Sequence, residues 1–326
     1  MLHRFLLLFV ILSSTMSGCI SNENGDISEQ DMGEGPFEDF SPFSEHCLEH
    51  DGLERCWLLL TPLIMNESNL VPLLVDIHGG GDDMYQQRWT SDFANISMEQ
   101  GFIVAYPQGH ENLWNQADGV LPGADQEDVG FILKMIEKIQ NNYTIDSSKI
   151  YVTGWSNGCG MAHRLAVQSS DIFAAAGCMS MYQFASIPND YSPIPFMEVH
   201  GLVDEVVHYA STAIAGVVLG IPVTGVEQGA MQNLEEWASL NGCQGSSPEI
   251  ISMEDDYDIR GYTQCENDAE VRLMTLFFAA HNPYLHDDPV TEQPGRGGGN
   301  PTGIPSSQIL WDFMSQYSKA TESEDT

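Results

Sequence analysis

Basic side chains are scarce in this sequence. The 326 residues contain 11 Lys and Arg against 47 Asp and Glu, which gives a formal net charge of −36 at pH 7. A chain of this charge is repelled by nucleic acid and by anionic lipid, so we expect neither as a partner, and an uncharged or cationic ligand fits better. The acidity itself is typical of a solvated surface rather than of a dedicated binding face.

The apolar run near the N-terminus is also short. Phe5–Leu12 follows two basic residues and precedes a string of small residues that ends at Cys19. A membrane-spanning helix needs about 20 apolar residues, so this layout predicts a secretory signal over residues 1–18. Met16–Cys19 resembles the cleavage box of lipoproteins. We therefore predict an exported, cell-surface protein whose only membrane contact is a lipid on Cys19, with plain secretion or an uncleaved anchor as alternatives. The oligomeric state stays open.

No C-x-x-C pair occurs in the sequence, which gives a structural zinc site little support. If Cys19 carries a lipid, six cysteines remain, and an even number in an exported protein suggests disulfides. Several pairings are possible, with free buried thiols as the alternative. Proximity along the chain favours Cys47–Cys56, Cys159–Cys178 and Cys243–Cys265.

The chain shows no internal repeat. Residues 22–43 are acidic, rich in Gly and Ser and without periodicity, so we expect a lipid-anchored tether over residues 19–43. One folded domain is predicted over residues 44–317, followed by a polar tail over residues 318–326. His286–Pro305 is rich in Gly and Pro, and we expect it to form a loop at the rim of a functional site.

Within the predicted domain, short apolar runs alternate with segments of helical period. This alternation predicts an α/β fold, a doubly wound, mostly parallel sheet flanked by helices, with the functional site at the carboxyl ends of the strands. The clearest strands are Leu70–Ile77, Phe102–Tyr106, Lys149–Thr153, Ile172–Cys178, Phe196–Val199 and Val271–Phe278. The clearest helix follows Asp125, and others are expected over Trp89–Glu99, Asn157–Gln168, Val226–Leu240 and Ser306–Tyr317.

Gly154–Gly158 reads Gly-Trp-Ser-Asn-Gly, which fits the G-x-S-x-G nucleophile elbow of α/β-hydrolases. The motif is weak alone, but a predicted strand precedes it and a predicted helix follows it. Ser156 would then sit on a sharp strand-to-helix turn, where glycines are needed because the backbone is strained and its neighbours pack closely. We predict that Ser156 is a catalytic nucleophile; an ordinary turn serine is the alternative.

A serine hydroxyl needs a base to remove its proton, and the base needs an orienting acid. In this fold the order along the chain is serine, acid, histidine. Asp204 follows the strand that ends near Val199, so it is the predicted acid, with Glu205 as the alternative. His281 follows the last predicted strand and is the predicted base, with His286 as the alternative.

An acyl-transfer site also requires donors for the tetrahedral oxyanion. The run His78–Gly81 follows a predicted strand and resembles the HGGG element, so backbone N–H groups of Gly79 and Gly80 are predicted donors. The N–H of Asn157, next to the nucleophile, is the third. Loops around Trp114 and Trp155 are expected to contact the substrate, and no metal or organic cofactor is needed.

The sequence resembles the family of polyhydroxybutyrate depolymerases, feruloyl esterases and acetyl xylan esterases within the α/β-hydrolase superfamily. The matching segments are Leu73–Gly80, Gly101–Gly109, Trp114–Asn115, Glu127–Phe131, Lys149–Gly158, Val199–Asp204, Trp237–Cys243 and Ile309–Phe313. The resemblance implies a triad of Ser156, Asp204 and His281. The stretch around the base, Phe278–Pro283, lacks the glycines and the Trp usual in that family.

The residues predict an exported serine esterase that works through an acyl-enzyme. The resemblance implies polysaccharide-linked feruloyl or acetyl esters, or polyhydroxyalkanoate-type esters, as its substrates. Two alternatives stay open. One is a serine peptidase on the same fold. The other is a non-catalytic surface binding protein on a degraded hydrolase scaffold, which the altered segment around His281 would favour.

Overall fold

The computed structural model describes residues 41–63, 69–118, 121, 123–218, 221–284 and 300–319. The chain clusters into two units, Met1–Phe40 and Ser41–Thr326, and only the second contains described residues. The predicted signal, Cys19, most of the tether and His286 lie outside these ranges. The same is true of most of the predicted rim loop and of the tail beyond Lys319.

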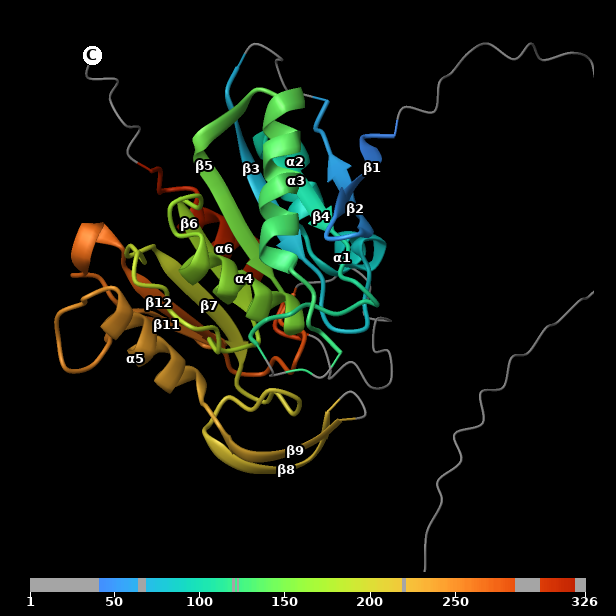
Figure 1. The fold of residues 1–326 in the computed structure, drawn as a ribbon. Coiled ribbons are helices and arrows are strands. Elements are labelled where there is room, and N and C mark those ends of the chain that lie inside the picture. Colours follow the sequence, from blue (N-terminus) through green and yellow to red (C-terminus); the bar gives the residue numbers. More distant parts are fainter. Residues whose placement is uncertain are drawn as a thin grey trace, which may run out of the picture. The chain divides into compact units, whose positions relative to one another are not determined.

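A ten-stranded mixed sheet forms the centre of the second unit (Figure 1). The strand order is β1-β2-β4-β3-β5-β6-β7-β12-β11-β10. The strands are β1 Phe43–His50, β2 Leu53–Leu60, β3 Val71–Ile77, β4 Ile103–Pro107, β5 Ile145–Gly154, β6 Ala175–Met179, β7 Phe196–Gly201, β10 Glu249–Met253, β11 Tyr257–Tyr262 and β12 Val271–Leu276. Neighbouring strands from β4 to β12 are parallel, and the pairs at both edges are antiparallel.

Helices cover both faces of this sheet (Figure 1). The helices α3 Asp128–Asn142, α4 Asn157–Gln168 and α5 Ala230–Leu240 bury apolar side chains against one face. On the other face lie α1 Met84–Thr90, α2 Phe93–Gln100 and α6 Ser306–Met314. This arrangement confirms the predicted α/β class, since all central strands are buried and covered on both sides. Among the described helices, none combines the length and apolarity that a bilayer crossing requires.

Two predicted helices differ from the structure. The segment Trp89–Glu99 is divided between α1 and α2, because Ser91 adopts an extended backbone and turns its hydroxyl inward to Asp76. The predicted helix Val226–Leu240 begins only at Ala230. Its first residues belong to β9 Ile221–Glu227, which pairs with β8 Thr212–Val218 in a separate hairpin. The β-branched residues of this segment favour the extended conformation.

Three disulfides link the cysteines in the predicted pairs, Cys47–Cys56, Cys159–Cys178 and Cys243–Cys265. Cys47 and Cys56 face each other directly across the hairpin of β1 and β2. Cys159 lies in the first turn of α4, and Cys178 lies near the end of β6. The second disulfide therefore ties the helix that follows Ser156 to the neighbouring strand.

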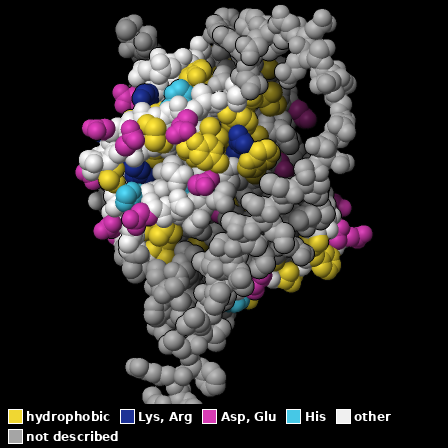
Figure 2. All heavy atoms as spheres, turned by 90° about the vertical axis from the view of Figure 1, so that its right-hand side faces the viewer, with side chains coloured by type: hydrophobic (Ala, Val, Ile, Leu, Met, Phe, Trp, Pro, Cys, Tyr) yellow, Lys and Arg dark blue, Asp and Glu magenta, His cyan; other side chains and the backbone are white. Residues whose placement is uncertain are grey.

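The face that bears α1 and β1 exposes hydrophobic side chains around a basic one (Figure 2). The Arg88 guanidinium carbon lies 4.6 Å from the Phe43 ring centroid and 4.5 Å from the Trp89 ring centroid. The Tyr85 hydroxyl donates to Glu45 at 2.5 Å. Cation–π contacts of this kind contribute about 0.5–1 kcal/mol at exposed sites. They fasten α1, which directly follows the glycine-rich run, to the edge of the sheet.

A buried ion pair lies near the start of β2. An Arg55 Nη donates to an Asp128 carboxylate oxygen at 2.6 Å, and both side chains are almost fully buried. Asp128 also accepts the backbone N–H of Asn115 at 2.8 Å, and the Arg55 guanidinium carbon lies 4.1 Å from the Phe131 ring centroid. The pair thus joins β2 to the start of α3 and to the segment that contains Trp114.

Removing one member of this pair is expected to be strongly destabilising. Arg55→Met leaves a buried carboxylate without its counter-charge, so we expect a loss of about 3–5 kcal/mol in the free energy of unfolding, measured by urea titration. As a control, Asp118→Asn removes a largely exposed partner of Arg164 and should change stability by less than about 1 kcal/mol. The double variant Arg55→Met/Asp128→Asn should lose less than the two single variants added together. Equal and small losses of stability in Arg55→Met, Asp128→Asn and the double variant would contradict this prediction.

Candidate active site

Ser156 stands at the turn between β5 and α4, with φ 53° and ψ −122°. A residue other than glycine rarely adopts a positive φ, and such a conformation costs about 1–3 kcal/mol. The flanking glycines leave the room that this turn requires. A Cβ on Gly154 would lie 2.6 Å from the Gly158 carbonyl oxygen, and one on Gly158 would lie 2.2 Å from the Ile77 carbonyl oxygen. The hydroxyl is therefore held at the carboxyl end of β5, beside the end of β3.

The structure brings the three predicted catalytic side chains together. The distance from His281 Nε2 to Ser156 Oγ is 2.9 Å, and the distance from His281 Nδ1 to Asp204 Oδ2 is also 2.9 Å. Because a carboxylate only accepts, Nδ1 carries a proton and Nε2 is free to accept the serine proton. His281 lies in the loop after β12, and Asp204 lies in the loop after β7. The alternative acid, Glu205, is exposed.

Asp204 is held firmly in its ionised form. Its Oδ1 accepts the backbone N–H groups of Val206 and Val207, each at 2.8 Å. Although burial raises the pKa of Asp204, hydrogen bonds from His200 and His281 outweigh burial and hold that pKa well below its usual range. A carboxylate with this many donors stays ionised at neutral pH, so it can fix the orientation and tautomer of His281.

The glycine-rich run after β3 is positioned by His78. The Nε2 of His78 accepts the N–H of Gly109 at 2.9 Å, so its Nδ1 carries the proton and donates to the Gly79 carbonyl oxygen at 2.8 Å. Burial lowers the pKa of His78 to about 4, and the ring is neutral. Since the peptide bond is planar and trans, the N–H of Gly80 points away from the Gly79 carbonyl and hence away from His78.

Asn157 is fixed next to the nucleophile. As the first residue of α4, its backbone N–H has no acceptor within the helix. Its side chain Oδ1 accepts the backbone N–H of Trp114 at 2.8 Å, and its Nδ2 donates to the Trp114 carbonyl at 3.0 Å. The run containing Trp114 therefore anchors the N-terminus of α4.

The two tryptophans that were expected to contact the substrate lie in the protein interior. Trp114 is fully buried and donates its indole N–H to the His78 carbonyl at 3.1 Å. Trp155 is 4% exposed and donates to the His281 carbonyl at 2.7 Å. Its ring also fills the space in which a Cβ on Gly79 would lie. Both residues therefore support the segments around Ser156 from behind, and neither offers a surface wide enough for a substrate to stack on.

Another buried histidine, His200, lies behind Asp204, and the sequence reasoning gave it no role. His200 Nε2 lies 3.4 Å from Asp204 Oδ2, and His200 Nδ1 lies 2.6 Å from Glu198 Oε1. Glu198 and His200 are two residues apart in β7 and hence share one face of the sheet. The available signal was the run His200-Gly-Leu-Val-Asp204, in which the histidine at the end of β7 precedes the acid by four residues.

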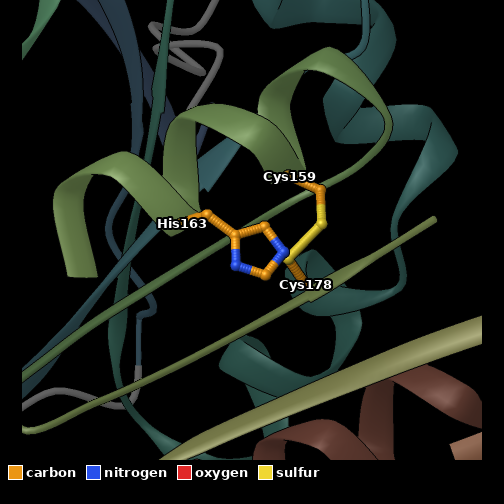
Figure 3. Close-up of side chains that lie close together, drawn as sticks. All are labelled: Cys159, His163 and Cys178. Atoms are coloured by element: carbon orange, nitrogen blue, oxygen red, sulfur yellow. A yellow bond between two sulfur atoms is a disulfide. The ribbon is translucent and has the colours of Figure 1, made fainter. Parts of the chain in front are cut away.

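One group of possible metal donors lies beside the site. Cys159, His163 and Cys178 lie close together in the core, as Figure 3 shows. The two sulfurs are joined in a disulfide, so neither is available as a thiolate. The His163 nitrogens are also occupied, since Nε2 lies 3.1 Å from the Met181 carbonyl and Nδ1 accepts the Trp237 indole N–H at 3.1 Å. This donor set does not fit a metal ion.

Comparison with known proteins places these residues in a family context. Feruloyl esterase B from Piromyces equi is 30% identical over 254 residues, which are 76% of this chain and 42% of that protein. A bifunctional acetylxylan esterase/xylanase from Neocallimastix patriciarum is 29% identical over 149 residues, which are 44% of this chain and 21% of the relative. The chain thus spans less than half the length of these relatives.

The fold is also found among solved structures. The acetyl xylan esterase from Aspergillus awamori aligns with a TM-score of 0.55 at 18% identity, covering 73% of this chain and 94% of that chain. A likeness at this identity supports the α/β fold. A family model described as esterase PHB depolymerase matches residues 57–226, a span that includes Gly79, Gly80, Ser156 and Asp204. Because this match covers just over half of the sequence, the chain belongs to the esterase PHB depolymerase family.

Proposed function

We propose that this protein is a carboxylic ester hydrolase with Ser156 as nucleophile, His281 as base and Asp204 as orienting acid. The observation that carries the proposal is the pair of hydrogen bonds that runs from Asp204 through His281 to the Ser156 hydroxyl. A hydroxyl, an imidazole and a carboxylate in this order provide an activated nucleophile for acyl transfer.

The proposed reaction has two steps. His281 Nε2 takes the proton of Ser156 as its Oγ attacks the ester carbonyl carbon, and the same proton then goes to the departing alcohol. Water, deprotonated by His281, next attacks the acyl-enzyme and releases the acid with free Ser156. The backbone N–H groups of Asn157 and of the Gly79–Gly80 run are the proposed donors to the oxyanion.

For the substrate we propose acyl esters on polysaccharides, of the feruloyl or acetyl type. The names of the similar proteins, feruloyl esterase B and a bifunctional acetylxylan esterase/xylanase, support this class. Polyester of the hydroxyalkanoate type is the competing substrate, because the family description names a PHB depolymerase. We also propose export, which the three disulfides support because such bonds persist in oxidising compartments. A lipid on Cys19 and the domain limits 44–317 belong to the same proposal.

Parallel assays of the full chain on methyl ferulate, acetylated xylan and hydroxybutyrate oligomers test the substrate class. We expect kcat/KM for one of the first two to exceed that for the oligomers by at least about tenfold. The reverse order would assign the protein to polyester hydrolysis. A nitrophenyl ester should give a burst of nitrophenol equal to the enzyme concentration if deacylation is slower than acylation. A folded protein without turnover on any of these esters would favour a binding role.

A further inference from the structure

Behind the proposed acid lies a second imidazole that the mechanism does not use. His200 is fully buried, and its ring lies between two carboxylates, those of Glu198 and Asp204. Its Nε2 also lies 2.8 Å from the Val207 carbonyl oxygen. The side chains therefore form a continuous row in which Glu198, His200, Asp204, His281 and Ser156 each contact the next.

Two of the proton positions in this row follow from the partners. A backbone carbonyl cannot donate, so His200 Nε2 must carry the proton between it and Val207. Asn233 Oδ1 accepts the backbone N–H of Gln183 at 2.9 Å, which identifies its Nδ2 as the donor to Glu198 Oε2 at 2.6 Å. One Glu198 oxygen is thus an acceptor already, and the other faces His200 Nδ1 at 2.6 Å.

The charged groups in contact with the His200 ring are both negative. The rings of Tyr182 and Tyr209 pack on it with centroid distances of 5.2 and 5.8 Å. The Tyr209 hydroxyl is hydrogen-bonded to Thr275 in β12. Of the nearby charged residues in β11, Asp258 raises the pKa of Tyr209 and Arg260 lowers it. The charged groups closest to the imidazole are the carboxylates of Glu198 and Asp204. Burial lowers the pKa of His200 and raises that of Glu198, but the hydrogen bonds to Asp204 and Glu198 outweigh burial at the imidazole and raise its pKa to about 10.

We infer that His200 is a positioning residue that stays an imidazolium at neutral pH, locking the Asp204 carboxylate in place and partly offsetting its charge. The role of His200 in catalysis rests on the proposed serine mechanism, whereas its proton state does not. An uncompensated Asp204 would attract the proton of His281 more strongly, and a protonated His281 cannot accept the proton of Ser156. The buried cation behind the acid thus widens the pH range in which the base is ready.

The proton state can be measured without any turnover. In full-length protein labelled with ¹⁵N-histidine, both ring nitrogens of His200 should keep the shifts of a protonated imidazole from pH 6 to pH 9. The assignment comes from the signal lost in His200→Gln. If that variant does not fold, Glu198→Gln identifies the same ring, because its removal of one carboxylate should let His200 lose a proton within this range. A neutral His200 ring at pH 7 in the unsubstituted protein would overturn the inference.

The effect on the base is measured by the pH dependence of kcat/KM for a nitrophenyl ester. His200→Gln keeps a donor near Val207 but removes the positive charge, so the acid limb should move to higher pH by about 1–2 units. The ring of His281 itself should hold its proton to a higher pH by NMR in His200→Gln.

His163→Gln is the matched control for these variants. His163 is also fully buried and stacked on an aromatic ring, but its nitrogens contact Met181 and Trp237 rather than carboxylates. Its replacement should change stability without moving the acid limb. An unshifted limb in a folded, active His200→Gln would leave the esterase proposal intact and overturn the role given to His200. A protein that lacks turnover altogether would overturn the esterase proposal, while the NMR titration of His200 and His281 would still decide the inference.

Discussion

Replacing Ser156 with alanine is expected to lower kcat on every ester by at least about 10⁴-fold. The substitution removes the only oxygen that lies within hydrogen-bond distance of His281 Nε2 among the described contacts, so the acyl-enzyme cannot form. Loss of the nucleophile in a serine hydrolase leaves only the catalysis that oxyanion donors and binding supply. The measurement is kcat for a nitrophenyl ester, together with the loss of the burst.

The control is Ser239→Ala, because Ser239 is an exposed serine of α5. This variant should keep kcat within about twofold, since surface substitutions away from special features change little. Both variants should show the same near-ultraviolet circular dichroism as the parent protein. Turnover by Ser156→Ala at more than about one hundredth of the parent rate would show that another group performs the attack.

Replacing His281 with alanine should have an effect of the same size. Without the imidazole, the Ser156 hydroxyl keeps its proton at neutral pH and attacks the ester poorly. Because the residues of such a triad act as a unit, the double variant Ser156→Ala/His281→Ala should be no slower than either single variant. The kcat values of the three variants test this non-additivity directly.

His286→Ala is the natural comparison, because His286 was the alternative base and lies outside the described residues. We expect it to keep activity within about threefold of the parent. If His286→Ala were instead the inactive variant and His281→Ala the active one, the hydrogen bond between His281 and Ser156 would not be the one used in catalysis.

Much of the fold could be read from the sequence, because its central elements carry clear patterns. The apolar, β-branched run at residues 71–77 and the helix-period segment at residues 128–142 form β3 and α3 as expected. The helix expected at Trp89–Glu99 was wrong as one element, since its break depends on a long-range contact between Ser91 and Asp76. A contact between distant residues leaves no trace in local periodicity.

The candidate site was predictable to a similar degree and for a similar reason. Ser156 is marked by its neighbours in the chain, because the glycines that the elbow needs stand two residues on either side. Loops around Trp114 and Trp155 were expected to contact the substrate. Periodicity cannot tell which side of a loop a ring faces, and both rings lie inward. His200 was noted only as part of the run that ends at Asp204, because its position between Glu198 and Asp204 is visible only in the structure.

The crosslink between Cys159 and Cys178 has a practical consequence for recombinant production. It closes a 19-residue stretch that begins three residues after Ser156, and closing a loop of that size contributes about 3 kcal/mol by limiting the unfolded chain. In a bacterial cytosol, where glutathione and thioredoxin keep thiols reduced, the bond would not persist. Expression directed to the periplasm, or into an oxidising strain, should therefore give a higher yield of protein with an intact elbow.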